Sequence, residues 1–136
     1  MNMRRALDQY KSVDLNSLLA NANPHQQVLM LLSGAIDRVS TAKGAIETGQ
    51  TELKGTSISK AITIIGGLQA ALEDLENNEV AQNLDRLYTY MYETLLKANL
   101  QSSTALLDEV KKLLLEIKTA WEQIPAGHHN TTSANG

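Results

Sequence analysis

The feature that most constrains this sequence is the long stretch between its two prolines, Pro24 and Pro125, in which apolar residues recur at intervals of three or four. Apolar side chains at this spacing share one face of an α-helix, whereas a half-buried strand needs strict alternation of apolar and polar residues. The stretch contains almost no such alternation, and it contains no proline that would interrupt a helix. The sequence therefore predicts an all-helical protein, with Leu32, Ile65 and Leu95 among the core-facing residues.

Start and stop signals mark the first and the last helix of this stretch. Asn23 suits the cap position, Pro24 suits the first helical position, and Gly49 suits the left-handed turn that follows a helix. Towards the other end, Ser102 or Ser103 is expected to cap a helix that ends before the second proline, because a residue that precedes proline avoids the helical conformation. A helix is therefore predicted at each end.

Two further helices are predicted between them. The polar residues 49–55 suit a connection, Thr56 or Ser57 suits the cap of the second helix, and Asn77-Asn78 suits its end. The third helix is expected to begin at Asn78, which makes the link between the second and third helices very short. Short links make successive helices run antiparallel, so the expected fold is an antiparallel up-down four-helix bundle.

The bundle is expected to occupy residues 23–125. Residues 1–22 carry enough apolar side chains to dock on another surface, but polar pairs interrupt them, which predicts an N-terminal cap segment made of a short helix and an extended lead-in. Residues 126–136 have no apolar period and are rich in Gly, Ser, Thr and Asn, which predicts a disordered tail. The chain is thus expected to form one domain with two extensions.

Composition argues against several classes of partner. The 12 basic side chains are outnumbered by 15 acidic ones and form no long run, so neither nucleic acid nor a membrane surface is an expected partner. No segment approaches the ~20 apolar residues of a membrane span. The sequence has no cysteine, which excludes disulfides and thiolate metal sites and fits a cytosolic location.

The three histidines, His25, His128 and His129, offer no metal or catalytic site. No glutamate stands three residues before any of them, as a di-iron bundle requires, and no pair is spaced by one helical turn, as a zincin requires. His25 is expected to be exposed in the first turn of its helix. Because no acid, base or nucleophile constellation is visible either, we expect no enzyme, no metal and no other cofactor.

Apolar residues exceed what four core-facing stripes can bury. The surplus predicts a groove between helices for an amphipathic partner helix, since half-exposed tyrosines suit such a site. The adjacent glycines Gly66 and Gly67 suggest that another backbone approaches closely, because helical glycine costs stability that close packing would offset. The residues alone therefore favour a binding module over an enzyme. A helical adaptor or oligomerisation protein that uses the same apolar strips is the alternative.

Six segments carry a resemblance to a known family. They are Tyr10 with Val13, NPHQQVLMLLSGAI at 23–36, SKAITII at 59–65, EVAQNLDRLYTYM at 79–91, KANL at 97–100 and EVKKLLLEIKTAWEQI at 109–124. In this order and spacing, the sequence resembles the FliS family of flagellin export chaperones from about residue 6 to residue 124. Thr89 departs from the family, which usually has aspartate there, and this affects any partner contact made through that carboxylate.

The resemblance implies a chaperone of the cytosol without catalytic activity. Its client would be the disordered C-terminal segment of flagellin, bound about one to one, kept from polymerising prematurely and delivered to the flagellar export gate. The resemblance also implies that residues 1–20, with Leu7 and Tyr10 as anchors, cover an apolar groove in the free protein until the client displaces them.

A further client site is expected in a groove between the second and third helices of the bundle. Each of the two helices would contribute four residues to it. They are Ile64, Gly67, Leu68 and Ala71 on one side and Asn83, Leu87, Tyr90 and Met91 on the other.

Overall fold

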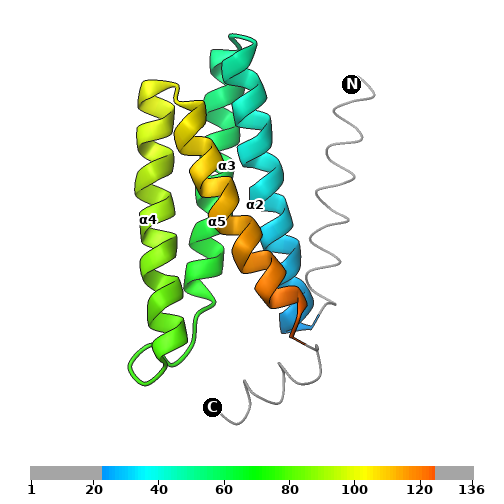
Figure 1. Ribbon diagram of the computed structural model, residues 1–136, viewed down its shortest axis with the longest axis vertical. Helices are drawn as coiled ribbons and strands as arrows, with labels where there is room; N and C mark the ends of the chain where they lie inside the picture. The colour runs from blue at the N-terminus through cyan, green and yellow to red at the C-terminus, as the bar shows by residue number, and fades with distance from the viewer. Residues whose placement is uncertain (1–22, 125–136) are drawn as a thin grey trace.

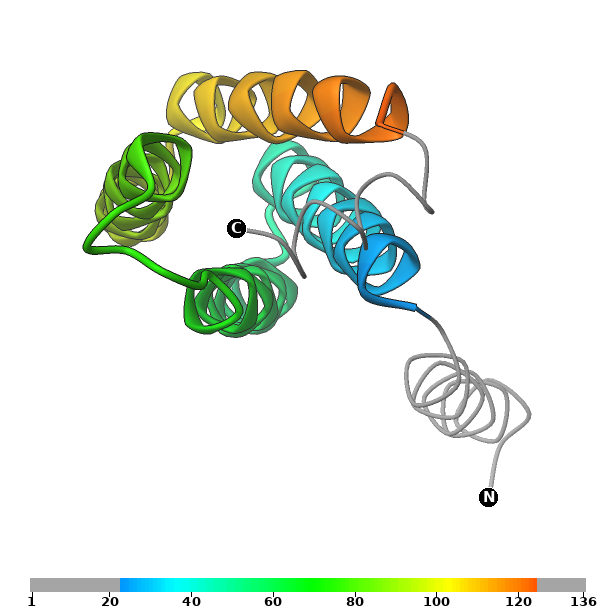
Figure 2. The same cartoon turned by 90° about the horizontal axis from the view of Figure 1, so that it is seen from below.

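The computed structural model describes residues 23–124, and four helices occupy most of this range. Each helix packs on the next along the chain and α5 also packs on α2, so the four form a closed ring around one core (Figures 1 and 2). The described residues contain no strand, which confirms the all-helical prediction. The predictions for residues 1–22 and 126–136 lie outside the described range. The helices are α2 (Pro24–Glu47), α3 (Thr51–Ala70), α4 (Glu79–Gln101) and α5 (Thr104–Glu122).

Side-chain caps determine where three of the helices begin. Asn23 Oδ1 accepts a hydrogen bond from the backbone N–H of Gln26 at 2.8 Å, and the backbone N–H of Asn23 donates to Gln26 Oε1 at 3.4 Å. Asn78 and Ser103 accept in the same way from backbone N–H groups at 3.1 and 3.2 Å. Such caps satisfy amides that no helical carbonyl can reach. The predicted starts of α2, α4 and α5 are confirmed, and Gly49 follows α2 with a left-handed φ of 72°, also as predicted.

The predicted start of α3 is wrong. The helix begins at Thr51, inside the segment 49–55 that was predicted as a connection, so the predicted cap lies within the helix. Lys54 Nζ donates to the Asn99 carbonyl oxygen at 3.0 Å and to Ser102 Oγ at 2.8 Å, which ties the first turn of α3 to the end of α4. Contacts between residues so far apart in the chain override the local signals on which the prediction rested.

The predicted end of α3 is also wrong. The helix ends at Ala70, well before the predicted end at Asn77-Asn78. Leu75 continues the apolar spacing, but Asp74 before it has a left-handed φ of 55° and Leu75 itself is 38% exposed. Apolar spacing does not reveal such a turn, because it records side-chain type and not backbone conformation. The link to α4 therefore spans residues 71–78 and is longer than predicted.

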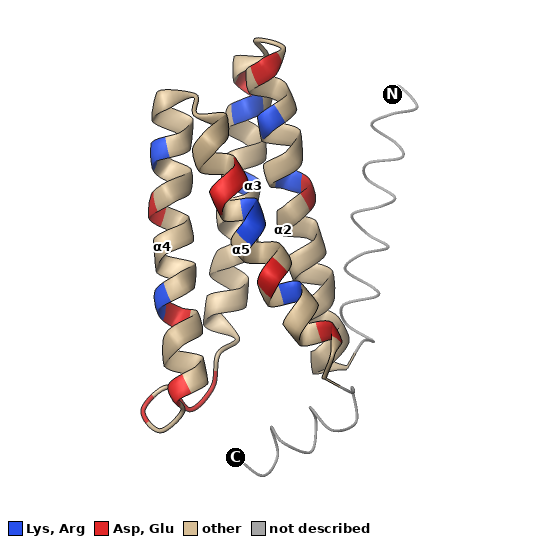
Figure 3. Ribbon diagram, in the orientation of Figure 1, with Lys and Arg blue, Asp and Glu red and all other residues tan. Residues whose placement is uncertain are grey.

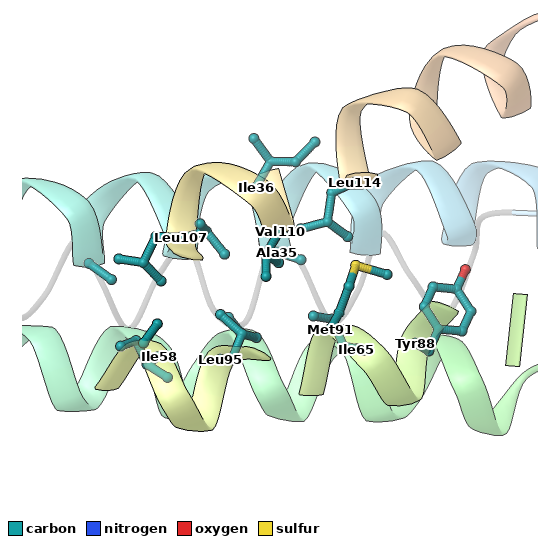
Figure 4. Close-up of a cluster of buried hydrophobic side chains, with 14 of the residues drawn as sticks. Ala35, Ile36, Ile58, Ile65, Tyr88, Met91, Leu95, Leu107, Val110 and Leu114 are labelled. Atoms are coloured by element: carbon teal, nitrogen blue, oxygen red, sulfur yellow. The ribbon is translucent and has the colours of Figure 1, made fainter. Parts of the chain in front are cut away.

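The core lies along the axis of the ring and takes side chains from all four helices. Figure 4 shows Ile58, Leu95 and Leu107 pointing towards one another from three of them. Burying each such side chain contributes roughly 1.5–3 kcal/mol, so apolar contact is the main term that holds the helices together. The largest fully buried apolar side chains are Leu32 and Val39 of α2, Ile58 and Ile65 of α3, Met91 and Leu95 of α4, and Leu107, Val110 and Leu114 of α5.

Tyr88 is expected to make the protein less stable at high pH. Its side chain is 2% exposed, and this burial raises the pKa of Tyr88 from 10.0 to about 12. Because the unfolded chain then loses the phenol proton at lower pH than the folded chain does, the free energy of unfolding should fall as the pH rises from about 10 towards 12. Denaturant titrations at a series of pH values measure this fall.

The matched control for this prediction is Tyr88→Phe, which keeps the ring and removes the ionisable hydroxyl. Tyr90, whose pKa is raised by its hydrogen bond to Glu109, and Lys43, whose pKa is raised by its hydrogen bond to Asp108, are present in both proteins, so their contributions cancel. The variant should lose less stability over this pH range. An equal loss in both proteins contradicts the assignment to Tyr88.

Candidate client-binding surface

An exposed apolar stripe follows the outer side of α4. Tyr92, Leu96 and Leu100 are 44%, 46% and 87% exposed. Residues four positions apart are neighbours on one side of a helix. Large apolar side chains gathered on one exposed face, rather than scattered singly, are typical of interaction sites. We name these three residues the α4 stripe.

The α4 stripe lies towards the flank of α4 that borders α3. Asp85, Thr89, Tyr92 and Leu96 recur at intervals of four, three and four residues and therefore share one side of the helix. Gln69 Nε2 of α3 donates to Asp85 Oδ1 at 2.8 Å and to Thr89 Oγ1 at 2.9 Å. These bonds hold the two helices together next to the stripe, which gives the surface a defined geometry.

The second half of α3 exposes only small, uncharged side chains. Residues 61–72 include no charged residue. Gly66 and Gly67 are exposed, and the Thr63 hydroxyl donates to the Ser59 carbonyl oxygen of its own helix at 3.1 Å, so it is already satisfied. A helix that approaches this part of α3 would therefore meet few protruding side chains and no charge.

The glycine pair is not a site of close packing within the chain. A Cβ atom built on Gly66 or Gly67 would meet no atom within 4 Å, so the predicted approach of another backbone is wrong for the described residues. Nearer the start of α3, residues of this helix and Asn99 of α4 line a shallow hollow of about 530 Å³. The surface along α3 is therefore open, and the hollow at its start includes the charged residues Glu52 and Lys60.

The four α3 residues of the predicted groove lie in the core or towards α2. Leu68 is 2% exposed and belongs to the core. Ile64 Cδ1 lies 3.5 Å from the position that a Cβ atom on Gly34 of α2 would take, so Ile64 faces α2. Gly67 and Ala71, three and seven residues further along, share that side of the helix and are exposed.

The four α4 residues of the predicted groove lie in the core or towards α5. Met91 is fully buried. The Tyr90 hydroxyl donates to Glu109 Oε2 of α5, and Asn83 and Leu87, seven and three residues earlier, share its side of α4. The structure therefore does not gather the eight predicted residues around one groove. Leu68 and Met91 lie in the core, the other α3 residues border α2, and the other α4 residues border α5.

None of the three residues of the α4 stripe was among the predicted site residues. Leu96 and Leu100 follow Tyr92 at four-residue intervals outside the core-facing stripe of the helix, and this second periodicity was the available signal. Two other predicted site residues, Leu7 and Tyr10, lie outside the part of the chain that the structure describes.

His25 is buried, which corrects the prediction that it is exposed. Its side chain is 7% exposed, and its ring stacks on that of Trp121 with centroids 5.7 Å apart. Trp121 Nε1–H donates to the His25 carbonyl oxygen at 3.0 Å, and His25 Nε2 lies 3.0 Å from the Trp121 carbonyl oxygen. The two residues are 96 positions apart, so no local pattern could have indicated the contact. We name this pair the His25–Trp121 clasp.

Charge does not define the candidate surface. Figure 3 shows basic and acidic residues interspersed along the helices and acidic residues at the link between α3 and α4. Lys43 forms an ion pair with Asp108 at 3.0 Å, between α2 and α5. Within residues 23–124, no cluster of three His, Cys, Asp or Glu side chains suits a metal ion. None of the helices described has the length and hydropathy needed to cross a membrane.

Comparisons with known proteins cover almost the whole chain. The family model described as Flagellar protein FliS matches residues 6–128. The flagellar secretion chaperone FliSB of Pseudomonas aeruginosa is 45% identical over 91% of this chain and 98% of its own length. The flagellar secretion chaperones FliS of Vibrio cholerae and Salmonella typhimurium are 40% and 41% identical over 97% and 85% of this chain and 97% and 86% of their own lengths. As the sequence resemblance predicts, this chain belongs to the FliS family of flagellar secretion chaperones.

Proposed function

We propose that this protein is a cytosolic chaperone that binds the disordered C-terminal segment of flagellin about one to one. Binding would prevent premature polymerisation of flagellin and hold the client for delivery to the flagellar export gate. The relatives named flagellar secretion chaperones support a role in flagellar export. This role requires recognition of an apolar segment and no catalytic step.

The observation that carries the proposal is the exposed α4 stripe. Tyr92, Leu96 and Leu100 expose apolar surface to water, which contact with a partner would remove. An amphipathic helix presents apolar side chains at the same three- and four-residue intervals, so it can lie along the stripe. A client segment that becomes ordered only on binding would gain this contact at an entropic cost, which limits its affinity and permits release.

Further client contacts are proposed on the side of α3 that borders α2 and on the side of α4 that borders α5. A client that used these flanks together with the α4 stripe would wrap around the bundle rather than occupy one groove. The flank residues are Ile64, Gly67 and Ala71 towards α2 and Asn83, Leu87 and Tyr90 towards α5, with Leu68 and Met91 beneath them in the core.

We also propose that residues 1–22 form a cap on an antiparallel up-down bundle. Leu7 and Tyr10 would anchor this segment on apolar surface in the free protein, and the client would displace them. The segment directly precedes Asn23, the cap of α2.

Calorimetric titration with a peptide covering the C-terminal segment of the cognate flagellin tests the proposed function. We expect saturable one-to-one binding with a negative heat-capacity change, because apolar surface is buried. Flagellin without this segment should give no binding heat. A protein that ignores the peptide and elutes as a stable oligomer would instead be a helical adaptor. Limited proteolysis of the same samples tests the cap, and equal protection of residues 1–20 with and without peptide contradicts it.

A further inference from the structure

The His25–Trp121 clasp joins the first turn of α2 to the last turn of α5. Each side chain lies within hydrogen-bond distance of the other residue's carbonyl oxygen, at 3.0 Å in both cases. The rings stack with an interplanar angle of 17°. Each residue is therefore held at both its backbone and its side chain, by the other residue.

The axis of α5 diverges from the centre of the ring towards the end of the helix that carries the clasp. It begins beside α4 and ends beside the start of α2, apart from the other end of α4 (Figures 1 and 2). Leu114 is its last fully buried side chain. Beyond Leu114, the apolar residues Ile117, Trp121 and Ile124 are half-buried. We name residues 115–124 the strap.

The strap is held less tightly than the preceding part of α5. The free energy of a local opening rises with the apolar surface that it exposes. Separating the strap from α2 breaks half-buried contacts and the clasp. Separating the preceding part of α5 would also expose Leu107, Val110 and Leu114, which are fully buried. The structure thus contains two parts of one helix with different expected resistance to opening.

We propose that the strap opens from α2 as a unit while the rest of the bundle stays folded, and that the His25–Trp121 clasp is the latch that sets how often it opens. Opening exposes Ile117 and Trp121 of the strap, which are half-buried when the strap is closed. The latch therefore controls access to an apolar surface that is separate from the α4 stripe. This inference does not depend on the proposed client.

Native-state hydrogen exchange on the full-length protein tests the opening. The backbone amides of residues 117–122 should share one opening free energy, lower than that of core amides such as those of Leu95 and Val110. Their exchange should depend only weakly on denaturant, because the opening exposes little surface. Exchange that rises gradually towards Glu122 would indicate simple fraying and overturn the proposal. Exchange of the strap only together with the core would also overturn it.

Two variants that retain an aromatic ring test the latch. Trp121→Phe removes the indole donor to the His25 carbonyl oxygen, and His25→Phe removes the imidazole nitrogen that lies near the Trp121 carbonyl oxygen. Each variant keeps a ring that can stack. Loss of one bond should raise exchange of the strap amides about fivefold. Thr119→Ser, an exposed change within the strap, should leave the rates unchanged. Unchanged strap exchange in both ring variants would show that the clasp is not the latch.

Leu95→Ala separates opening of the strap from unfolding of the whole protein. Leu95 is fully buried in α4 and stays buried when only the strap opens. Its replacement should therefore accelerate exchange of core amides and leave strap amides unchanged. The clasp variants should accelerate both sets by the same factor, because the clasp is absent from the open and the unfolded states alike. Equal acceleration of strap and core by Leu95→Ala would overturn the proposal.

Discussion

Replacement of Leu95 by alanine is expected to lower the free energy of unfolding by roughly 2–5 kcal/mol. Leu95 is fully buried and points into the core with Ile58 and Leu107 (Figure 4). The variant loses the apolar burial of the side chain and leaves a cavity that helices packed on all sides cannot fully close. Urea denaturation followed by circular dichroism measures the loss as a lower midpoint at an unchanged slope.

The adjacent residue provides a matched control for this prediction. Leu96 is 46% exposed and belongs to the α4 stripe. Leu96→Ala makes the same chemical change in the same helix but removes less buried surface, so it should change stability by about 0.5 kcal/mol or less. Similar losses in the two variants would contradict the placement of Leu95 in the core.

Replacement of Leu96 by aspartate is expected to weaken binding of the flagellin peptide roughly tenfold to a hundredfold. The change removes apolar surface from the middle of the α4 stripe and places a charge where the client would bury its own apolar side chains. Because Leu96 is half exposed in the free protein, the fold should tolerate the charge. The calorimetric titration of the proposed function measures the affinity, and circular dichroism confirms that the variant is folded.

Leu115→Asp is the matched control for Leu96→Asp. Leu115 lies on α5 and is 42% exposed, close to the exposure of Leu96, so the two changes should have similar effects on the fold. We expect the affinity for the peptide to remain unchanged in Leu115→Asp. Equal affinities in the two variants would show that the client site is not on the α4 stripe. Loss of affinity in Leu115→Asp alone would show that the site is on α5.

The sequence by itself determined the fold class, three helix starts and the family. Asn23, Asn78 and the pair Ser102-Ser103 were identifiable as helix starts because a cap forms between residues within one turn of each other. Leu32, Ile65 and Leu95 were identifiable as core residues because their apolar spacing follows the helical period. Both kinds of information are local in the chain.

The bounds of α3 depended on contacts that are not local. Lys54 ties the first turn of α3 to Asn99 and Ser102 at the end of α4, so the helix includes residues whose composition suggested a connection. His25 is a similar case, since its ring nitrogen lies within hydrogen-bond distance of Trp121, 96 positions away in the chain. In both cases, the polar groups of one helix are satisfied by another helix.

Only the tertiary structure decided which surface each candidate residue joins. Helical spacing shows that Ile64, Gly67 and Ala71 lie on one side of α3, but it does not show which neighbour that side meets. The arrangement of the ring places this side towards α2, and it places Tyr90 towards α5. Periodicity defines directions within one helix, whereas a binding surface is defined by how helices are rotated relative to one another. That rotation is set by the packing of the whole core.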